Sequence, residues 1–89
     1  MNKARRDEVK MYAVQLKAED TLRGGSKEMF EQTGYVGIYP DYPHAYVLYR
    51  TREEQRNAWE YFHKHFAYCK IVANPVFVEK KYIPREVIQ

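Results

Sequence analysis

The chain has 89 residues, of which 45% are hydrophobic and 30% are charged. This composition excludes a disordered chain, and the length allows a single domain. Fifteen Lys and Arg residues against twelve Asp and Glu residues give a formal net charge of +3, which is too small and too evenly spread to identify nucleic acid as the partner.

Cysteine content and hydropathy indicate an intracellular protein. The single cysteine, Cys69, cannot form a disulfide within the chain, whereas small secreted scaffolds usually contain several. No apolar run is long enough for a membrane span, and the N-terminus lacks the apolar core of a signal peptide. We therefore expect a cytoplasmic protein without a membrane partner (in the host cytoplasm if a phage encodes it), with residues 1–8 as a loose N-terminal segment.

The first predicted elements are a strand and a short helix. Residues 9–18 alternate between apolar and polar side chains, as strands do. A loop with a glycine pair follows. Residues 26–34 then carry helix signals at both ends, with Ser26 as the N-terminal cap and Gly34 in the left-handed position beyond the C-terminus.

A tyrosine-rich hairpin comes next. Residues 34–50 contain five of the nine tyrosines of the chain. Within this stretch, residues 35–39 and 44–50 are typical of strands. The segment between them, PDYP, predicts a turn because both prolines oppose helix.

The second half begins with a helix. Thr51 and Glu54 form a T-x-x-E capping box, and the helix is expected to end near Phe66. Its apolar face should lie in the core, with Trp59 at the centre; this face comprises Ala58, Trp59, Phe62 and Phe66. Residues 68–73 are typical of a strand, and residues 76–83 of an edge strand that continues after Asn-Pro.

The order strand, helix, strand, strand, helix, strand predicts an α+β fold. In so short a chain it is most economically a ferredoxin-like plait, a four-stranded antiparallel sheet with two helices on one face. The crossover rule places the first and third strands in the centre. We expect one domain over residues 9–83 and a C-terminal tail over residues 84–89.

Strand alternation then predicts an open face, the side of the sheet without helices. The side chains expected there as binding residues are Tyr35, Tyr39, His44, Tyr46, Arg50 and Lys70. Alternation also places Tyr68 on this face beside Lys70, but Tyr68 is not counted among the binding residues. Tyr12 is ambiguous, because either it or its neighbours Met11 and Ala13 could be the buried set. So many exposed rings need a cover: a ligand, a partner, a second copy or the C-terminal segment 76–89.

Two stretches resemble the RNA-recognition motif. Residues 44–49, HAYVLY, resemble the aromatic segment on the third strand of that family, although Tyr42 and Pro43 stand where the family has a basic residue and a glycine. Residues 11–16, MYAVQL, resemble the first-strand segment, with Tyr12 at its stacking position. KEMFEQTGYV and TREEQRNAWEYF resemble the two helices, so the likeness spans roughly residues 11–73.

This resemblance implies a domain that binds single-stranded RNA or DNA. Tyr12 and Tyr46, with His44 as a third candidate, would stack on bases. Arg50 and Lys70 would lie near the phosphates.

The chain is also similar, more loosely, to small accessory proteins of bacteriophages and mobile elements. Such proteins often bind and inhibit a host protein, and a tyrosine-rich face suits that role because tyrosine is enriched at interface hot spots. A homodimer that buries the same face is a third alternative.

We expect no catalysis, no cofactor and no metal site. His63 and His65 point apart on a helix, so together with Cys69 they make a poor zinc site. Cys69 alternates toward the core, where thiols are usually inert. No pair of carboxylates lies in an apolar setting that would support acid–base chemistry. The protein is therefore expected not to be an enzyme.

Overall fold

A computed structural model describes residues 7–84. Its elements are β1 (Glu8–Lys17), η1 (Ala18–Leu22), α1 (Ser26–Gln32), β2 (Gly37–Asp41), β3 (His44–Tyr49), α2 (Arg52–Phe62), β4 (Cys69–Ile71), β5 (Val76–Glu79) and η2 (Lys80–Tyr82), where η denotes a 3₁₀ helix. Most of the expected N-terminal segment 1–8 and C-terminal tail 84–89 lies outside the described residues.

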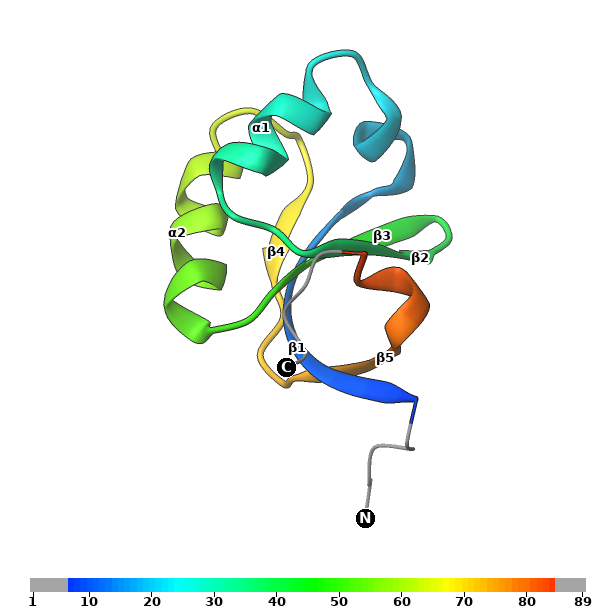
Figure 1. Ribbon diagram of the computed structural model, residues 1–89. Coiled ribbons are helices and arrows are strands. Elements are labelled where there is room, and N and C mark those ends of the chain that lie inside the picture. The colour runs from blue at the N-terminus through cyan, green and yellow to red at the C-terminus, as the bar shows by residue number, and fades with distance from the viewer. Residues whose placement is uncertain (1–6, 85–89) are drawn as a thin grey trace.

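The predicted α+β class is confirmed, and the arrangement is that of a ferredoxin-like plait (Figure 1). The strands lie in the order β2-β3-β1-β4, so the first and third strands are central as expected. β1 is longer than its neighbours. Its C-terminal part pairs antiparallel with β3 and β4, and its N-terminal part, Glu8 to Met11, pairs with β5.

The main core lies between the sheet and the two helices. Val14 and Leu16 of β1 pack with Val47 and Tyr49 of β3 against the helix residues Phe30, Ala58, Phe62 and Phe66. Tyr49 is fully buried, and its hydroxyl lies 2.6 Å from Thr33 Oγ1. Because Thr33 Oγ1 already donates to the Phe30 carbonyl, the Tyr49 hydroxyl is the donor of that bond.

Two of the predicted helix signals are confirmed. Thr51 Oγ1 accepts a hydrogen bond from the Glu54 N–H at 3.1 Å, and Gly34 has a φ of 79° beyond the end of α1. The capping role of Ser26 is wrong. Ser26 is the first helical residue, Gly25 takes the N-cap position, and the Ser26 hydroxyl donates to the Asp20 carbonyl at 2.6 Å.

The predicted end of the second helix and the predicted core centre are also wrong. α2 ends at Phe62, although Phe66 still packs into the core from the following turn. Trp59 is only partly buried, and its Nε1 donates to the Cys69 carbonyl at 3.3 Å. The centre of the helix-side core is therefore Phe62 rather than Trp59, because the wide indole sits at the margin of the α2–β4 contact.

A second hydrophobic cluster lies on the opposite side of the sheet, the open face. Met11, Ala13, Val36 and Leu48 are buried there beneath Val78 and Ile83. Figure 1 shows β5 and η2, in orange and red, on the side of β2 and β3 opposite α1. We call residues 76–83 the C-terminal cover. The chain thus covers part of its own open face, which is one of the four covers that the sequence left open.

Candidate functional site

The C-terminal cover leaves part of the open face free, toward the β2–β3 turn. Four rings lie in this free part: Tyr39, His44, Tyr46 and Tyr68. We call them the aromatic strip. All four are partly exposed. The strip therefore lies between a fixed apolar cluster on one side and solvent on the other.

Strand register explains how the strip is assembled. Tyr39 pairs with Tyr46, Tyr46 with Gln15, and Gln15 with Lys70, so one row crosses all four strands. In the next row Asp41 pairs with His44, and His44 with Lys17. Residues paired across strands lie on the same face, so both rows belong to the open face.

The rings are fixed by contacts with one another. Tyr39 and Tyr46 are nearly parallel, with 6.3 Å between ring centroids and 11° between planes. His44 lies against Tyr68 at 4.7 Å. The Tyr68 hydroxyl donates to Gln15 Oε1 at 2.6 Å. At the border of the C-terminal cover, Tyr82 meets Tyr39 edge-on at 4.8 Å.

The charges around the strip are of both signs. Lys17 and Lys70 are exposed on its β1–β4 side. On the other side, Asp41 lies near Tyr46. Burial, together with the charge of Asp41 and a hydrogen bond to it, raises the pKa of the Tyr46 hydroxyl. An anion is therefore favoured on the β1–β4 side and opposed beside Asp41.

The expected binding residues are only partly brought together. Tyr39, His44, Tyr46 and Lys70 gather at the strip. Arg50 is exposed, but it follows the end of β3 that is farthest from His44.

The expected placement of Tyr35 on the open face is wrong. Its ring packs on the helix side, edge-on to Phe30 at 5.9 Å between centroids. A β-bulge causes the change: Gly37 pairs with Leu48, yet the Val36 N–H also donates to the Leu48 carbonyl. Val36 and Gly37 therefore both lie opposite the single residue Leu48. As a result, the side chain of Val36 is on the open face and that of Tyr35 is on the helix side.

Tyr12, whose side was ambiguous, lies on the helix side with Val14 and Leu16. It is partly exposed, and the Arg52 guanidinium lies over its ring at 4.8 Å. The stacking position that the resemblance assigned to Tyr12 is therefore not part of the strip. Met11 and Ala13 are also buried, beneath the C-terminal cover. The ambiguity arose because both faces of β1 are covered at this point.

Sequence reasoning left Tyr68, Gln15 and Lys17 out of the candidate site. Tyr68 carried a usable signal, because alternation placed it on the open face beside Lys70. The side chains of Gln15 and Lys17 lie on the same face of β1 as that of Ala13. Their placement therefore depended on which face Tyr12 occupies, and the sequence left that question open.

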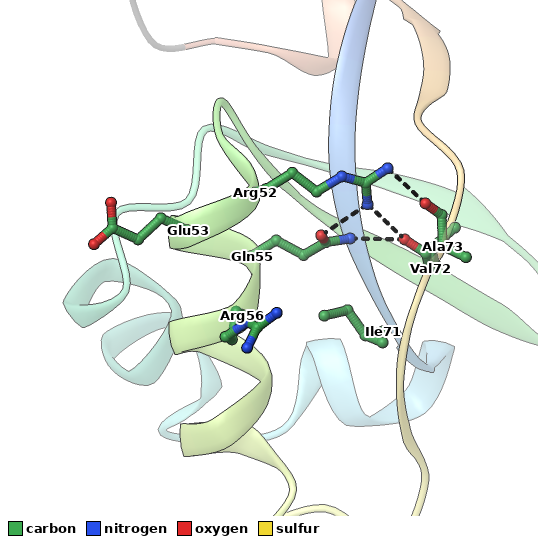
Figure 2. Close-up of a pocket in the computed structure, with 7 residues that line it drawn as sticks. All are labelled: Arg52, Glu53, Gln55, Arg56, Ile71, Val72 and Ala73. Atoms are coloured by element: carbon green, nitrogen blue, oxygen red, sulfur yellow. Dashed lines mark hydrogen bonds between the residues drawn. The ribbon is translucent and has the colours of Figure 1, made fainter.

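A hollow lies between α2 and β4, and a network of hydrogen bonds forms part of its wall (Figure 2). Buried Gln55 donates to the Ala13 carbonyl at 2.7 Å and to the Val72 carbonyl at 2.9 Å. Arg52 donates to Gln55 Oε1 and to the Ala73 carbonyl. These polar groups hold α2 to the strand edge, and the remaining lining is Glu53, Arg56 and Ile71.

The histidines and the cysteine do not converge. His63 stacks on Trp59 at 4.6 Å, and His65 lies against Tyr61 at 5.0 Å. Burial raises the pKa of the Cys69 thiol to about 11, so it is protonated at neutral pH. Within residues 7–84, no group of three or more His, Cys, Asp or Glu side chains could hold a metal ion.

No protein-family model, curated protein or solved structure matches this chain. In the described part of the chain, no helix has the length and apolar character needed to cross a membrane.

Proposed function

We propose that the protein is a small non-catalytic module that binds single-stranded RNA or DNA through the aromatic strip. The observation that carries this proposal is the row Tyr39, Tyr46, Gln15 and Lys70 on the free part of the open face. It combines partly exposed rings, an amide and an ammonium group. Stacking of a base on such a ring contributes about 1–3 kcal/mol and depends little on sequence.

The packing of the rings supports this role. Tyr39 and Tyr46 pack against the cluster beneath the C-terminal cover, and this contact restricts the movement of both rings. Side chains that are already fixed lose little conformational entropy when a ligand binds. The strip is thus a preorganised surface for planar groups.

The charges around the aromatic strip determine on which side the sugar-phosphate backbone of a bound strand lies. Phosphates are favoured near Lys17 and Lys70, whereas Asp41 repels them beside Tyr46. Bases would therefore lie over the rings while the backbone follows the β1–β4 side. Two phosphate contacts imply a modest salt dependence, with log K falling against log salt at a slope of about −1.4.

The test is a titration of a labelled mixed-sequence oligonucleotide at low salt. We expect Tyr46→Ala to weaken binding by about 5- to 150-fold, the range that corresponds to one stacked base. Lys70→Gln should lower the salt slope by about 0.7, whereas Lys64→Gln, exposed on the helix side, should not change it. Equal affinity of Tyr46→Ala and wild type, or no binding at low salt, contradicts the proposal.

A further inference from the structure

An apolar hollow of about 550 Å³ lies beside the aromatic strip, between η1 and the β2–β3 turn. Its volume is within the range of about 300–1,000 Å³ that is usual for small-ligand sites. The lining is mostly apolar and consists of Lys17, Ala18, Glu19, Leu22, Tyr42, Pro43 and His44.

The rim of the hollow carries the two most exposed large apolar side chains among the described residues. Leu22 is 86% exposed and Tyr42 is 89% exposed. Side chains with so little packing contribute little to folding. Exposed apolar groups that gather around one hollow are typical of an interaction site.

The walls of the hollow are held by hydrogen bonds. The Ala18 N–H donates to the Pro43 carbonyl at 3.0 Å, which joins η1 to the β2–β3 turn. Behind it, buried Asp20 pairs with Arg23 at 2.8 Å, and Thr21 Oγ1 donates to the Ala18 carbonyl. The exposed side chains of the rim are thus attached to a backbone that hydrogen bonds hold in place.

The hollow is continuous with the aromatic strip. His44 lines the hollow and is also one of the four rings of the strip. Lys17, the partner of His44 across the strands, lines the hollow as well. A nucleic-acid strand that passes over His44 therefore enters the hollow directly, with the ammonium group of Lys17 beside it.

We propose that the hollow extends the nucleic-acid path, and this inference depends on the proposed function of the strip. The next nucleobase after His44 stacks on Tyr42 and packs against Leu22 and Pro43. Lys17 contacts the phosphate between the two bases. Glu19, which also lines the hollow, repels a phosphate placed near it, so the backbone stays near Lys17.

The experiment measures binding of a labelled mixed-sequence hexanucleotide at low salt to wild type, Tyr46→Ala, Tyr42→Ala and Leu22→Ser. Ile71→Ala, an exposed apolar residue away from both surfaces, is the control. We expect Tyr42→Ala to weaken binding at least about fivefold, the lower end for one stacked base. Leu22→Ser should weaken it to a smaller extent, and Ile71→Ala should not change it. Because Leu22 and Tyr42 are highly exposed, both variants should remain folded, which thermal melts verify.

The possible failures are distinguishable. If Tyr46→Ala weakens binding but Tyr42→Ala and Leu22→Ser bind like wild type, the strip is retained and its extension into the hollow is overturned. If wild type does not bind the hexanucleotide, the proposed function and the extension both fail, and a protein partner for this surface becomes the better explanation. Additive losses in the Tyr42→Ala, Tyr46→Ala double variant support two separate stacking positions.

Discussion

A β-carbon on Gly37 would lie 1.8 Å from the carbonyl oxygen of Tyr82. The backbone of the C-terminal cover therefore approaches β2 at a point where only glycine leaves room. The same segment carries Val78 and Ile83, which are both buried in the cluster on the open face. Gly37 thus permits the close approach of the C-terminal cover to β2, two pairs along the strand from Tyr39 and Tyr46 of the aromatic strip.

The Gly37→Ala substitution should displace the C-terminal cover. Loss of the burial of one apolar side chain costs about 1.5–3 kcal/mol, so a clear decrease in the free energy of unfolding is expected. Hydrogen exchange should increase at Val78 and in the first half of β1. Gly24→Ala is the matched control, because its β-carbon would meet nothing within 4 Å. Equal stability of the two variants would show that the cover does not depend on the close approach.

Gln55 should contribute strongly to stability although it is polar. It is 1% exposed and bonds the carbonyls of Ala13 and Val72, which belong to β1 and to the segment after β4. Removal of two such hydrogen bonds in Gln55→Ala should cost about 1–3 kcal/mol in denaturant titrations. Asn57→Ala, on the exposed surface of α2, should change stability by less than about 0.5 kcal/mol. A Gln55→Ala variant as stable as Asn57→Ala would refute this role.

Phe62 and Trp59 should differ in their contributions to the core. Phe62 is fully buried and meets Phe30 and Phe66, so Phe62→Ala should cost about 3–5 kcal/mol. Trp59 is partly exposed and lies at the margin, so Trp59→Ala should cost less. Urea titrations of both variants provide the comparison, and a larger loss for Trp59→Ala would contradict the packing described here.

Stability should fall at alkaline pH. Burial raises the pKa of Cys69 to about 11 from a reference of 9.0, and it also raises the pKa of Tyr49 above its reference of 10.0. A raised pKa in the folded state stabilises the fold below the unfolded pKa and ceases to do so as pH rises through the folded value. The decline should therefore begin near pH 9 with Cys69 and continue above pH 10 with Tyr49.

Two variants separate these contributions. Cys69→Ala should remove the first part of the decline, and Tyr49→Phe the part above pH 10, in unfolding titrations from neutral to alkaline pH. The readout is the slope of the free energy of unfolding against pH. The absolute free energy is not used, because Tyr49→Phe also loses the hydrogen bond to Thr33. A wild-type stability that stays constant through pH 9–11 would contradict the burial of both groups.

Local signals predicted most of the fold. The Thr51 cap, Gly34 and the alternation of β3 depend on neighbouring residues alone, so they could be recognised from the sequence. They also fixed the element order, from which the strand order follows. The bulge at Val36 and Gly37 could not be recognised, because it shifts the alternation of a single strand and is stabilised by a distant partner, Leu48.

The candidate site was harder to predict because the C-terminal cover decides its limits. Residues 76–83 were expected to form an edge strand, and only the first four do so, after which the chain turns across the open face. That path depends on contacts of Val78 and Ile83 with side chains far away in sequence. Strand alternation correctly placed Tyr39, Tyr46 and Lys70 at the candidate site. It could not show that Tyr35 and Arg50 lie away from that site.

Chemical-shift mapping of a single-stranded oligonucleotide at low salt tests the central claim most directly. We predict the largest amide and ring shifts at Tyr39, Tyr46 and Tyr68, with smaller shifts at Lys70 and no change at Lys64 on the outer side of the fold. Shifts confined to α2, or no shifts at all, would contradict nucleic-acid binding at the aromatic strip.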